Sequence, residues 1–327
     1  MLNSDPTHKL KLFTGRAHPV LAEAIATHLG VKLGRLIVNE FPDTETAVRI
    51  DEDVRGRDVF IVQPTCPPVN QNLMELMVIL DAFKRASPHR ITAVLPYFGY
   101  ARQDRKDMSR VPISAKLVAN LLTTAGAHRV LALDLHTAQI QGFFDIPVDH
   151  LYAVKEITGF VRSLNIPPGE MVVLSSDEGA IKKALIYQKR LGGGIAVVDK
   201  RRSSATKTEQ AHIVGVPVEG KHVLIFDDMI STAGTIAGAA VAAKRNGAKT
   251  VSVCATHGIL CGPAIERLRE APIDRIAVCD SIPISPEKML PNLQIISIAG
   301  LLATAIKRIH GNESVSDLFQ DVATVGS

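Results

Sequence analysis

Tryptophan is absent from the 327-residue chain, and aromatic residues make up only 4% of it. Its four cysteines stand at irregular spacings without a C-x-x-C pair, which favours neither a zinc site nor a disulfide framework and is typical of free thiols in a reducing compartment. No apolar run approaches the ~20 residues of a transmembrane helix. The amino-terminal segment carries charges and a proline where a secretory signal needs an apolar core. We therefore expect a cytoplasmic protein without a membrane partner.

An excess of charge of one sign is also missing. The formal net charge of +4 comes from 37 basic and 33 acidic residues that are interspersed along the sequence. Because nucleic-acid binding needs a concentrated basic surface, this distribution argues against nucleic acid as a partner. A few local arginine clusters would suit small anionic ligands instead.

What the sequence does contain is an alternation of short apolar runs with longer amphipathic segments. The alternation predicts parallel sheets that are covered by helices on both faces. It begins again after Asp149, which indicates two similar α/β halves of about 150 residues each. The expected strands lie around Leu12 and at residues 58–63, 91–96, 129–135, 171–176, 194–199, 222–227, 250–256, 275–280 and 294–298, and the expected helices at residues 70–86, 114–125, 154–164, 178–189, 232–245 and 301–309.

The domain organisation follows from this alternation. We predict an amino-terminal α/β domain at residues 1–150, a carboxy-terminal α/β domain at residues 151–310 and a tail at residues 311–327. Two cation-rich segments, residues 97–112 and 200–211, interrupt the alternation directly after a strand. In α/β sheets ligands bind beyond the carboxyl ends of the strands, so both segments are candidate active-site loops.

Residues 223–235, VLIFDDMISTAGT, carry the most specific pattern. An apolar strand is expected to end in two carboxylates, which can accept hydrogen bonds from vicinal sugar hydroxyls. Small and hydroxylated residues follow at the start of a helix, where backbone N–H groups can approach an anion. The pattern predicts a sugar-phosphate site formed by Asp227, Asp228, Ser231, Thr232, Ala233, Gly234 and Thr235.

An ordinary capped helix is the alternative interpretation of this segment, and S-T-A-G alone would favour it. Two adjacent carboxylates on a buried strand are costly without a partner, which favours a ligand. The ATP-binding P-loop pattern G-x-x-x-x-G-K-[ST] is absent from the sequence.

These residues carry a resemblance to a known family. The segment VLIFDDMISTAGT is similar to the phosphoribosyl-pyrophosphate-binding loop of type I phosphoribosyltransferases, and nearly the whole chain resembles the class I ribose-phosphate pyrophosphokinases, or phosphoribosyl pyrophosphate synthetases. Further matching segments are FPDTE from Phe41, NLMELM from Asn72, PYFGYARQDRK from Pro96, DLHTAQIQGFFDIPVDH from Asp134, DKRR from Asp199, THGILCGPAIERL from Thr256 and RIHGNESVSDLF from Arg308.

The resemblance implies both a fold and an activity. The fold is two domains of the type I phosphoribosyltransferase-like kind, each a parallel sheet flanked by helices. The activity is ribose-phosphate diphosphokinase: transfer of the β,γ-diphosphate of ATP to the C1 hydroxyl of ribose 5-phosphate, which feeds nucleotide biosynthesis. Mg²⁺ is the implied cofactor, phosphate and ADP are candidate effectors, and the implied assembly is a homo-oligomer, expected to be a hexamer.

Residue roles also follow from the resemblance. Lys200 and Arg202 correspond to the cations of a flexible catalytic loop, and His136 and Asp177 to metal-associated residues. The matched ATP-binding positions are Phe41, Asp43 and Glu45, which the family supplies from a neighbouring subunit, together with Arg102, Gln103 and Asp107.

The chain departs from the family pattern near several of these residues. Ser231 stands where the family usually has aspartate, and SSDEGA replaces S-P-D-x-G-G, with Ala180 at the second glycine. The Cβ of Ala180 could crowd a ligand or extend a helix. These changes leave a non-catalytic regulatory paralogue as an alternative, and the shared loop chemistry leaves a phosphoribosyltransferase as a further one.

Overall fold

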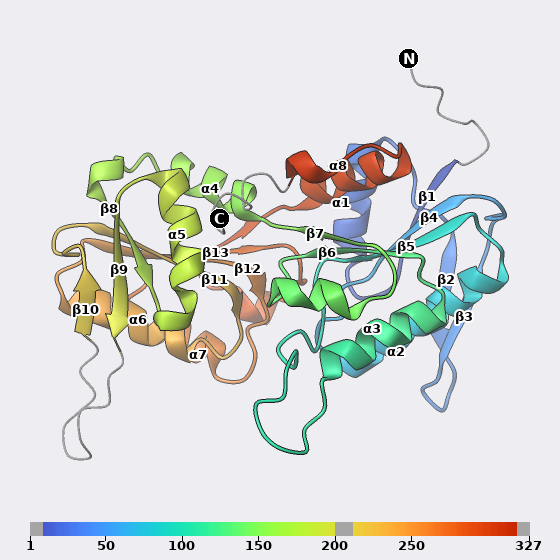
Figure 1. Ribbon diagram of the computed structural model, residues 1–327, viewed down its shortest axis with the longest axis horizontal. Helices are drawn as coiled ribbons and strands as arrows, with labels where there is room; N and C mark the ends of the chain where they lie inside the picture. The colour runs from blue at the N-terminus through green and yellow to red at the C-terminus, as the bar shows by residue number, and fades with distance from the viewer. Residues whose placement is uncertain (1–8, 200–211, 319–327) are drawn as a thin grey trace. The chain divides into compact units, whose positions relative to one another are not determined.

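The computed structural model describes residues 9–199 and 212–318 (Figure 1). These residues fall into two compact units. The first unit holds the described residues up to Tyr152, with Ser281–Pro283 and the described residues from Ile298 onward. The second unit holds the described part of Ala153–Asp280, together with Ile284–Ser297.

The first unit is built on a five-stranded sheet in the order β1-β4-β5-β6-β7, in which all pairings are parallel. Figure 1 shows α1 and α8 on one side of this sheet and α2 and α3 on the other. A separate antiparallel hairpin of β2 and β3 packs on α2. The elements are β1 (Leu10–Thr14), α1 (Pro19–Leu29), β2 (Leu36–Glu40), β3 (Thr46–Ile50), β4 (Asp58–Val62), α2 (Val69–Arg85), β5 (Arg90–Leu95), α3 (Ser114–Ala125), β6 (Arg129–Leu133), η1 (Ala138–Phe143), β7 (Val148–Leu151), α8 (Ala299–His310) and η5 (Ser316–Leu318).

The second unit is built on a seven-stranded sheet in the order β10-β9-β8-β11-β12-β13-β14. Its pairings are parallel except for the edge strand β10, which runs antiparallel to β9. The elements are α4 (Val154–Ser163), η2 (Pro168–Glu170), β8 (Met171–Ser175), η3 (Glu178–Ala180), α5 (Ile181–Leu191), β9 (Gly194–Asp199), β10 (His212–Gly215), β11 (His222–Ile230), α6 (Gly234–Arg245), β12 (Thr250–Gly258), α7 (Ala264–Glu270), β13 (Arg275–Cys279), η4 (Pro286–Lys288) and β14 (Leu293–Ile296). Across the described ranges of both units, no helix combines the length and the apolar character needed to span a membrane.

The carboxy-terminal helix α8 lies outside the domain in which the sequence predicts it. The sequence predicts one continuous second domain at residues 151–310, but α8 belongs to the first unit. It packs against α1, and its side chains Leu302 and Ile306 are fully buried. Sequence alternation shows that a helix follows a strand, but it does not show which sheet the helix covers.

Strand β11 also differs from expectation, because it continues to Ile230 instead of ending at the acid pair. The neighbouring strand β12 is equally long, and its Ala255 and Gly258 lie opposite Asp227 and Ile230. The strand therefore does not end at the two carboxylates as predicted, because both lie within it. A partner of matching length lets the pairing resume at Met229 and Ile230, beyond two residues that are poor strand formers.

A buried carboxylate on β4 links helix α8 to the five-stranded sheet through polar contacts. Asp58 is 2% exposed, and it accepts hydrogen bonds from Arg90 Nε at 2.8 Å and Nη2 at 2.5 Å. His310 Nδ1 lies 2.8 Å from Asp58 Oδ2, and Arg90 Nη2 also donates to the carbonyl of Ile309 at 3.0 Å. Burial alone would raise the pKa of Asp58, but the hydrogen bonds from His310 and Arg90 outweigh it and hold the pKa below its usual value.

We predict that Asp58→Asn lowers the free energy of unfolding by about 3 kcal/mol, because Arg90 and His310 lose their buried counter-charge. The matched control is Asp81→Asn, which breaks an exposed pair with Arg85 and should leave the free energy of unfolding nearly unchanged. Urea denaturation measures both. Because folding lowers the pKa of Asp58, its contribution is complete above the unfolded value of about 3.9 and disappears as the pH falls through the folded value. Equal losses in the two variants would contradict the assigned role.

Candidate functional site

A pocket of about 410 Å³ in the first unit brings together four of the predicted site residues, Arg102, Gln103, Asp107 and His136. This volume lies within the ~300–1,000 Å³ of typical small-molecule sites. The complete lining is Arg102, Gln103, Asp104, Arg105, Asp107, Val111, Pro112, His136 and Thr137.

The pocket forms where two neighbouring parallel strands end. Residues 97–112 follow β5, and His136 and Thr137 follow β6, so both segments leave the sheet at the same edge. Thr137 Oγ1 donates to Asp104 Oδ2 at 2.7 Å and joins the two segments. The exposed guanidinium groups of Arg102 and Arg105 make the pocket suitable for an anion.

Gln103 has a second role within this segment. Its side-chain oxygen accepts a hydrogen bond from Ser114 Oγ, and its carbonyl accepts one from Ala115 N at 3.1 Å. The residue therefore holds the start of α3, which explains part of its position without any ligand.

The predicted adenine-contacting residues Phe41, Asp43 and Glu45 lie in the loop of the β2–β3 hairpin and do not line the pocket. The loop is closed by hydrogen bonds from Phe41 N to the Glu45 carbonyl and from Thr44 N to the Phe41 carbonyl, both at 2.8 Å. Asp43 Oδ1 accepts from Glu45 N at 3.2 Å. The Phe41 side chain is 54% exposed, so a well-ordered turn presents a large apolar group to its surroundings.

In the second unit, the predicted metal residue Asp177 caps the turn that leads into α5. Asp177 Oδ1 accepts a hydrogen bond from Ala180 N at 3.0 Å. Ala180 has right-handed helical geometry, with φ of −87°, so its Cβ fits the start of the helix. Within residues 9–199 and 212–318, no group of three or more His, Cys, Asp or Glu side chains is placed to hold a metal ion.

The acid pair on β11 has a partner that sequence reasoning missed. Lys183 on α5 lies between the two carboxylates, with Nζ 2.9 Å from Asp227 Oδ1 and 2.5 Å from Asp228 Oδ1. Burial raises the pKa of Asp227 to about 6, with Asp228 adding to the shift and Lys183 opposing it. Burial also tends to lower the pKa of Lys183, but the two carboxylates outweigh it and raise that pKa.

An aromatic contact places Lys183 at the acid pair. Tyr187, one helical turn further along α5, stacks on Phe226 of β11 with ring centroids 3.8 Å apart and an interplanar angle of 7°. Residues four apart share a helix face, so Lys183 points at the same strand. The lysine and the acids are 44 and 45 residues apart in the chain, and no local pattern links them.

The loop after β11 has the geometry of an anion site. Helix α6 begins at Gly234, and no side chain caps it. The first N–H groups of a helix lack intrahelical partners and lie at the positive end of its dipole. Ala233 adopts a left-handed conformation, with φ of 61°, which costs about 1 kcal/mol for a residue with a side chain. Strain of this kind is typical of functional loops.

Neighbouring segments hold this loop in place. Ser231 Oγ lies 3.3 Å from Cys261 Sγ, and the Ser231 carbonyl accepts a hydrogen bond from Cys261 N at 3.0 Å. Arg267 of α7 donates from Nη1 to the carbonyl of Thr232 at 3.0 Å. The side chains of Thr232 and Thr235 remain exposed. Lys200 and Arg202, the predicted catalytic cations, lie outside the described residues.

The protein has two parallel sheets covered by helices. In the second sheet, the central strand β11 carries the acid pair and is followed by the uncapped start of α6. These features define the class of this protein as an α/β protein of the type I phosphoribosyltransferase-like kind. Family models match residues 10–126, as the N-terminal domain of ribose phosphate pyrophosphokinase, and residues 204–320, as the phosphoribosyl synthetase-associated domain. The chain belongs to the ribose-phosphate pyrophosphokinase family.

Individual relatives agree with this assignment over nearly the full length. A ribose-phosphate pyrophosphokinase of Rhodopirellula baltica is 61% identical, over 96% of this chain and 99% of its own. Ribose-phosphate pyrophosphokinase 1, chloroplastic, of Arabidopsis thaliana is 47% identical, over 95% of this chain and 77% of its own. The crystal structure of phosphoribosylpyrophosphate synthetase from Mycobacterium smegmatis is 46% identical and has a TM-score of 0.87, covering 93% of this chain and 99% of that one.

These findings confirm the family, the α/β fold with its parallel sheets, and the enzyme class that the sequence predicted. The roles of the individual site residues stay predictions.

We predict that Lys183→Met lowers the free energy of unfolding by about 2 kcal/mol at neutral pH, because two half-buried carboxylates lose their shared cation. The matched control is Lys182→Met, since Lys182 is the exposed neighbour on the same helix and should change stability by about 0.5 kcal/mol or less. Thermal and urea unfolding measure both variants.

The loss of stability in Lys183→Met should depend on pH, and the direction of that dependence follows from the pKa of Asp227. Folding raises the pKa of Asp227 to about 6, so this group favours the folded state most when protonated, and its contribution to wild-type stability falls as the pH rises from about 4 to about 6. Without the lysine, the pKa of Asp227 rises further. The deficit of Lys183→Met should therefore be largest above pH ~6 and shrink at lower pH. A deficit independent of pH would contradict the pairing.

Proposed function

We propose that the chain transfers the β,γ-diphosphate of ATP to the C1 hydroxyl of ribose 5-phosphate, giving phosphoribosyl pyrophosphate and AMP. The observation that carries the proposal is the acid pair of β11 followed directly by the uncapped start of α6, in a chain of this family. In the reaction a bond forms between the C1 oxygen and the β-phosphorus, and the bond between that phosphorus and the α,β-bridging oxygen breaks. AMP is the leaving group, and the hydroxyl proton is released.

The ribose 5-phosphate half of the site is proposed on the second unit. The 5-phosphate would lie at the start of α6, where backbone N–H groups of residues 233–235 and the hydroxyls of Thr232 and Thr235 act as donors. Asp227 and Asp228 would accept hydrogen bonds from the vicinal ribose hydroxyls. Lys183 already binds both carboxylates, and this contact holds them in place before the sugar arrives.

The ATP half is proposed on the first unit. The pocket of Arg102, Arg105 and His136 offers cations and a ring nitrogen to the phosphates, and its size suits a small anionic ligand. Phe41 would stack on the adenine, with Asp43 and Glu45 accepting from the exocyclic amine. The exposure of Phe41 supports the proposal that this loop serves a neighbouring subunit of a homo-oligomer, which we expect to be a hexamer.

The described residues fit a magnesium ion held mainly by its substrate. Mg²⁺ commonly takes one or two protein carboxylates together with phosphate oxygens and water, so a cage made only of protein groups is not required. The Asp177 carboxylate accepts a hydrogen bond from Ala180 N in the structure and keeps further acceptor sites. We propose Asp177 and His136 as the metal-associated residues. When bound, Mg²⁺ would neutralise charge on the diphosphate and polarise it.

Lys200 and Arg202 are proposed to stabilise the negative charge that develops on the transferred diphosphate, which is the largest electrostatic demand of phosphoryl transfer. We propose a cytoplasmic location, with phosphate and ADP as effectors. Ser231 and Ala180 favour a non-catalytic regulatory paralogue as the second candidate.

We predict that the purified protein forms AMP and phosphoribosyl pyrophosphate from ATP, ribose 5-phosphate and Mg²⁺, and that Lys200→Ala lowers kcat by about 10³-fold, since it removes one charge-stabilising group. Chromatography of the nucleotides measures the rate. The control is Lys189→Ala, which removes an exposed lysine of α5 and should leave kcat unchanged. A wild-type rate at background level would leave the regulatory paralogue as the better account.

We predict that Ser231→Asp lowers the KM for ribose 5-phosphate by about tenfold, because a carboxylate restores a charged hydrogen-bond acceptor beside the sugar. Ser231→Asn has the same size without the charge and is the matched control. Initial rates at saturating ATP measure both variants. An unchanged or raised KM in the aspartate variant would show that this account of the loop is wrong.

A further inference from the structure

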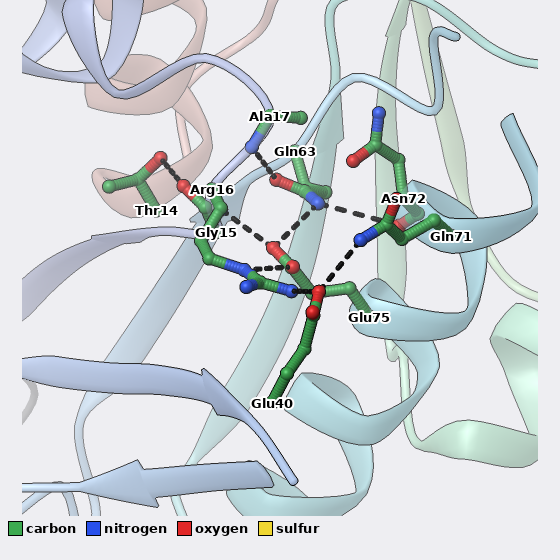
Figure 2. A network of polar contacts seen from close by, with 9 residues as sticks. All are labelled: Thr14, Gly15, Arg16, Ala17, Glu40, Gln63, Gln71, Asn72 and Glu75. Carbon is green, nitrogen blue, oxygen red and sulfur yellow. Dashed lines mark hydrogen bonds and ion pairs between the residues drawn. The ribbon is translucent and has the colours of Figure 1, made fainter. Parts of the chain in front are cut away.

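A network of polar side chains lies beside the β2–β3 hairpin and belongs to none of the roles described above. Figure 2 shows Arg16 between two carboxylates, Glu75 of α2 and Glu40 at the end of β2. Arg16 follows β1, and Gln63, which also takes part, follows β4. The network therefore lies at the carboxyl ends of parallel strands, the edge at which the pocket segments of the first unit also leave the sheet.

Glu75 is the buried centre of this network. It is 1% exposed. Its carboxylate accepts from Arg16 N at 2.6 Å, from Arg16 Nε at 2.7 Å and from Gln63 Nε2 at 3.0 Å. Gln63 Oε1 in turn accepts from Ala17 N at 3.2 Å. A buried charge with this many donors has a single arrangement, so the guanidinium of Arg16 is fixed in direction.

Gly15 permits this close approach. A Cβ at Gly15 would lie 2.4 Å from Gln63 Oε1 and 2.7 Å from Glu75 Oε1. Both distances are far shorter than any contact that a methyl group makes, so only glycine lets the chain turn beside Glu75. The turn brings both the backbone N and the side chain of Arg16 onto the same carboxylate.

The guanidinium nitrogen Nη2 of Arg16 contacts the hairpin. Arg16 Nη2 donates to Glu40 Oε1 at 2.9 Å, and Gln71 Nε2 of α2 donates to the same oxygen at 2.8 Å. Glu40 is the last residue of β2, directly before Phe41. Among the described strands, β2 and β3 pair only with each other, and a backbone hydrogen bond to the five-stranded sheet, from Gly34 N to the Leu12 carbonyl at 2.7 Å, lies before β2, at the base of the hairpin. No strand pairing with that sheet therefore holds the tip.

The other end of the hairpin has its own attachment. Glu52 accepts from Arg35 N at 2.6 Å and pairs with Lys11 of β1. Glu52 and Arg35 lie next to the outer ends of β3 and β2, far along the strands from the loop. Two separate polar contacts therefore fix the base and the tip of the hairpin, and the tip contact is the one beside Phe41.

We propose that Arg16 is a positioning residue, which through Glu40 holds the loop of residues 41–45 in the orientation required for nucleotide binding. The proposal rests on the proposed function in one respect, the role of that loop at the ATP. The geometry itself is independent of that role: a buried carboxylate orients Arg16, Arg16 contacts Glu40, and Glu40 directly precedes the loop.

The test uses the full chain in its native assembly with two variants. Glu40→Gln removes the charge at the tip and leaves the buried Arg16–Glu75 pair intact, so it should fold normally. Arg16→Ala removes the link from the other side. Asp81→Asn, on the outer face of α2, is the matched control because it breaks an exposed ion pair without touching the hairpin.

We expect both variants to raise the KM for ATP by about fivefold, the effect of one lost charge-assisted hydrogen bond. The KM for ribose 5-phosphate and the kcat should stay within about twofold, and the double variant should be no worse than the worse single one. Hydrogen exchange gives a second readout: the hydrogen-bonded amides of Phe41, Thr44 and Glu45 should exchange faster than in the control.

Two outcomes overturn the proposal. One is exchange and ATP kinetics in Glu40→Gln that match those of Asp81→Asn. The other is an equal rise of both Michaelis constants, which reports a general loss of structure instead of loop positioning. If the wild type forms no phosphoribosyl pyrophosphate, the proposed function fails, whereas exchange at residues 41–45 still decides whether Arg16 positions the loop.

Discussion

Two adjacent carboxylates on a half-buried strand are the constraint around which the second unit is arranged. Asp227 and Asp228 cannot both stay ionised in this setting without a cation, and Lys183 supplies one. That requirement explains why α5 lies where it does, with Tyr187 stacked on Phe226 to hold the helix against the strand. The same strand then leads into a strained residue and an uncapped helix. An acid pair and a helix start suited to an anion thus lie next to each other by chain continuity alone.

In the first unit, too, buried carboxylates fix the positions of nearby cations. Parallel strands end at one edge, so segments far apart in sequence meet there and form the pocket of Arg102 and His136. Buried carboxylates again fix the surrounding cations: Glu75 orients Arg16, and Asp58 joins Arg90 to the carboxy-terminal helix. In each case a charge held inside the protein determines the direction of a more exposed side chain. This gives polar loops a defined geometry without covering them in apolar residues.

Much of the fold could be predicted from hydrophobic periodicity, because strands buried on both faces read as short apolar runs and their covering helices as amphipathic ones. The loop at residues 223–235 could be predicted as a sugar-phosphate site, since its small residues, hydroxyls and acids are contiguous. Lys183, Arg16 and Glu75 could not, because each acts on residues that are distant in the chain. The length of β11 escaped prediction for a related reason: β12, its neighbour in the sheet, decides it.

By itself, the sequence determined the α/β class, the family and the loops that we propose as the active site, because these depend on local patterns that no tertiary contact can remove. Only the tertiary structure decided that α8 packs with the first unit, that the acid pair lies inside a strand with a lysine between its carboxylates, and that Arg16 holds the tip of the hairpin. The physical reason is that burial and pairing of charge depend on distances between atoms, and the linear order of residues does not contain those distances.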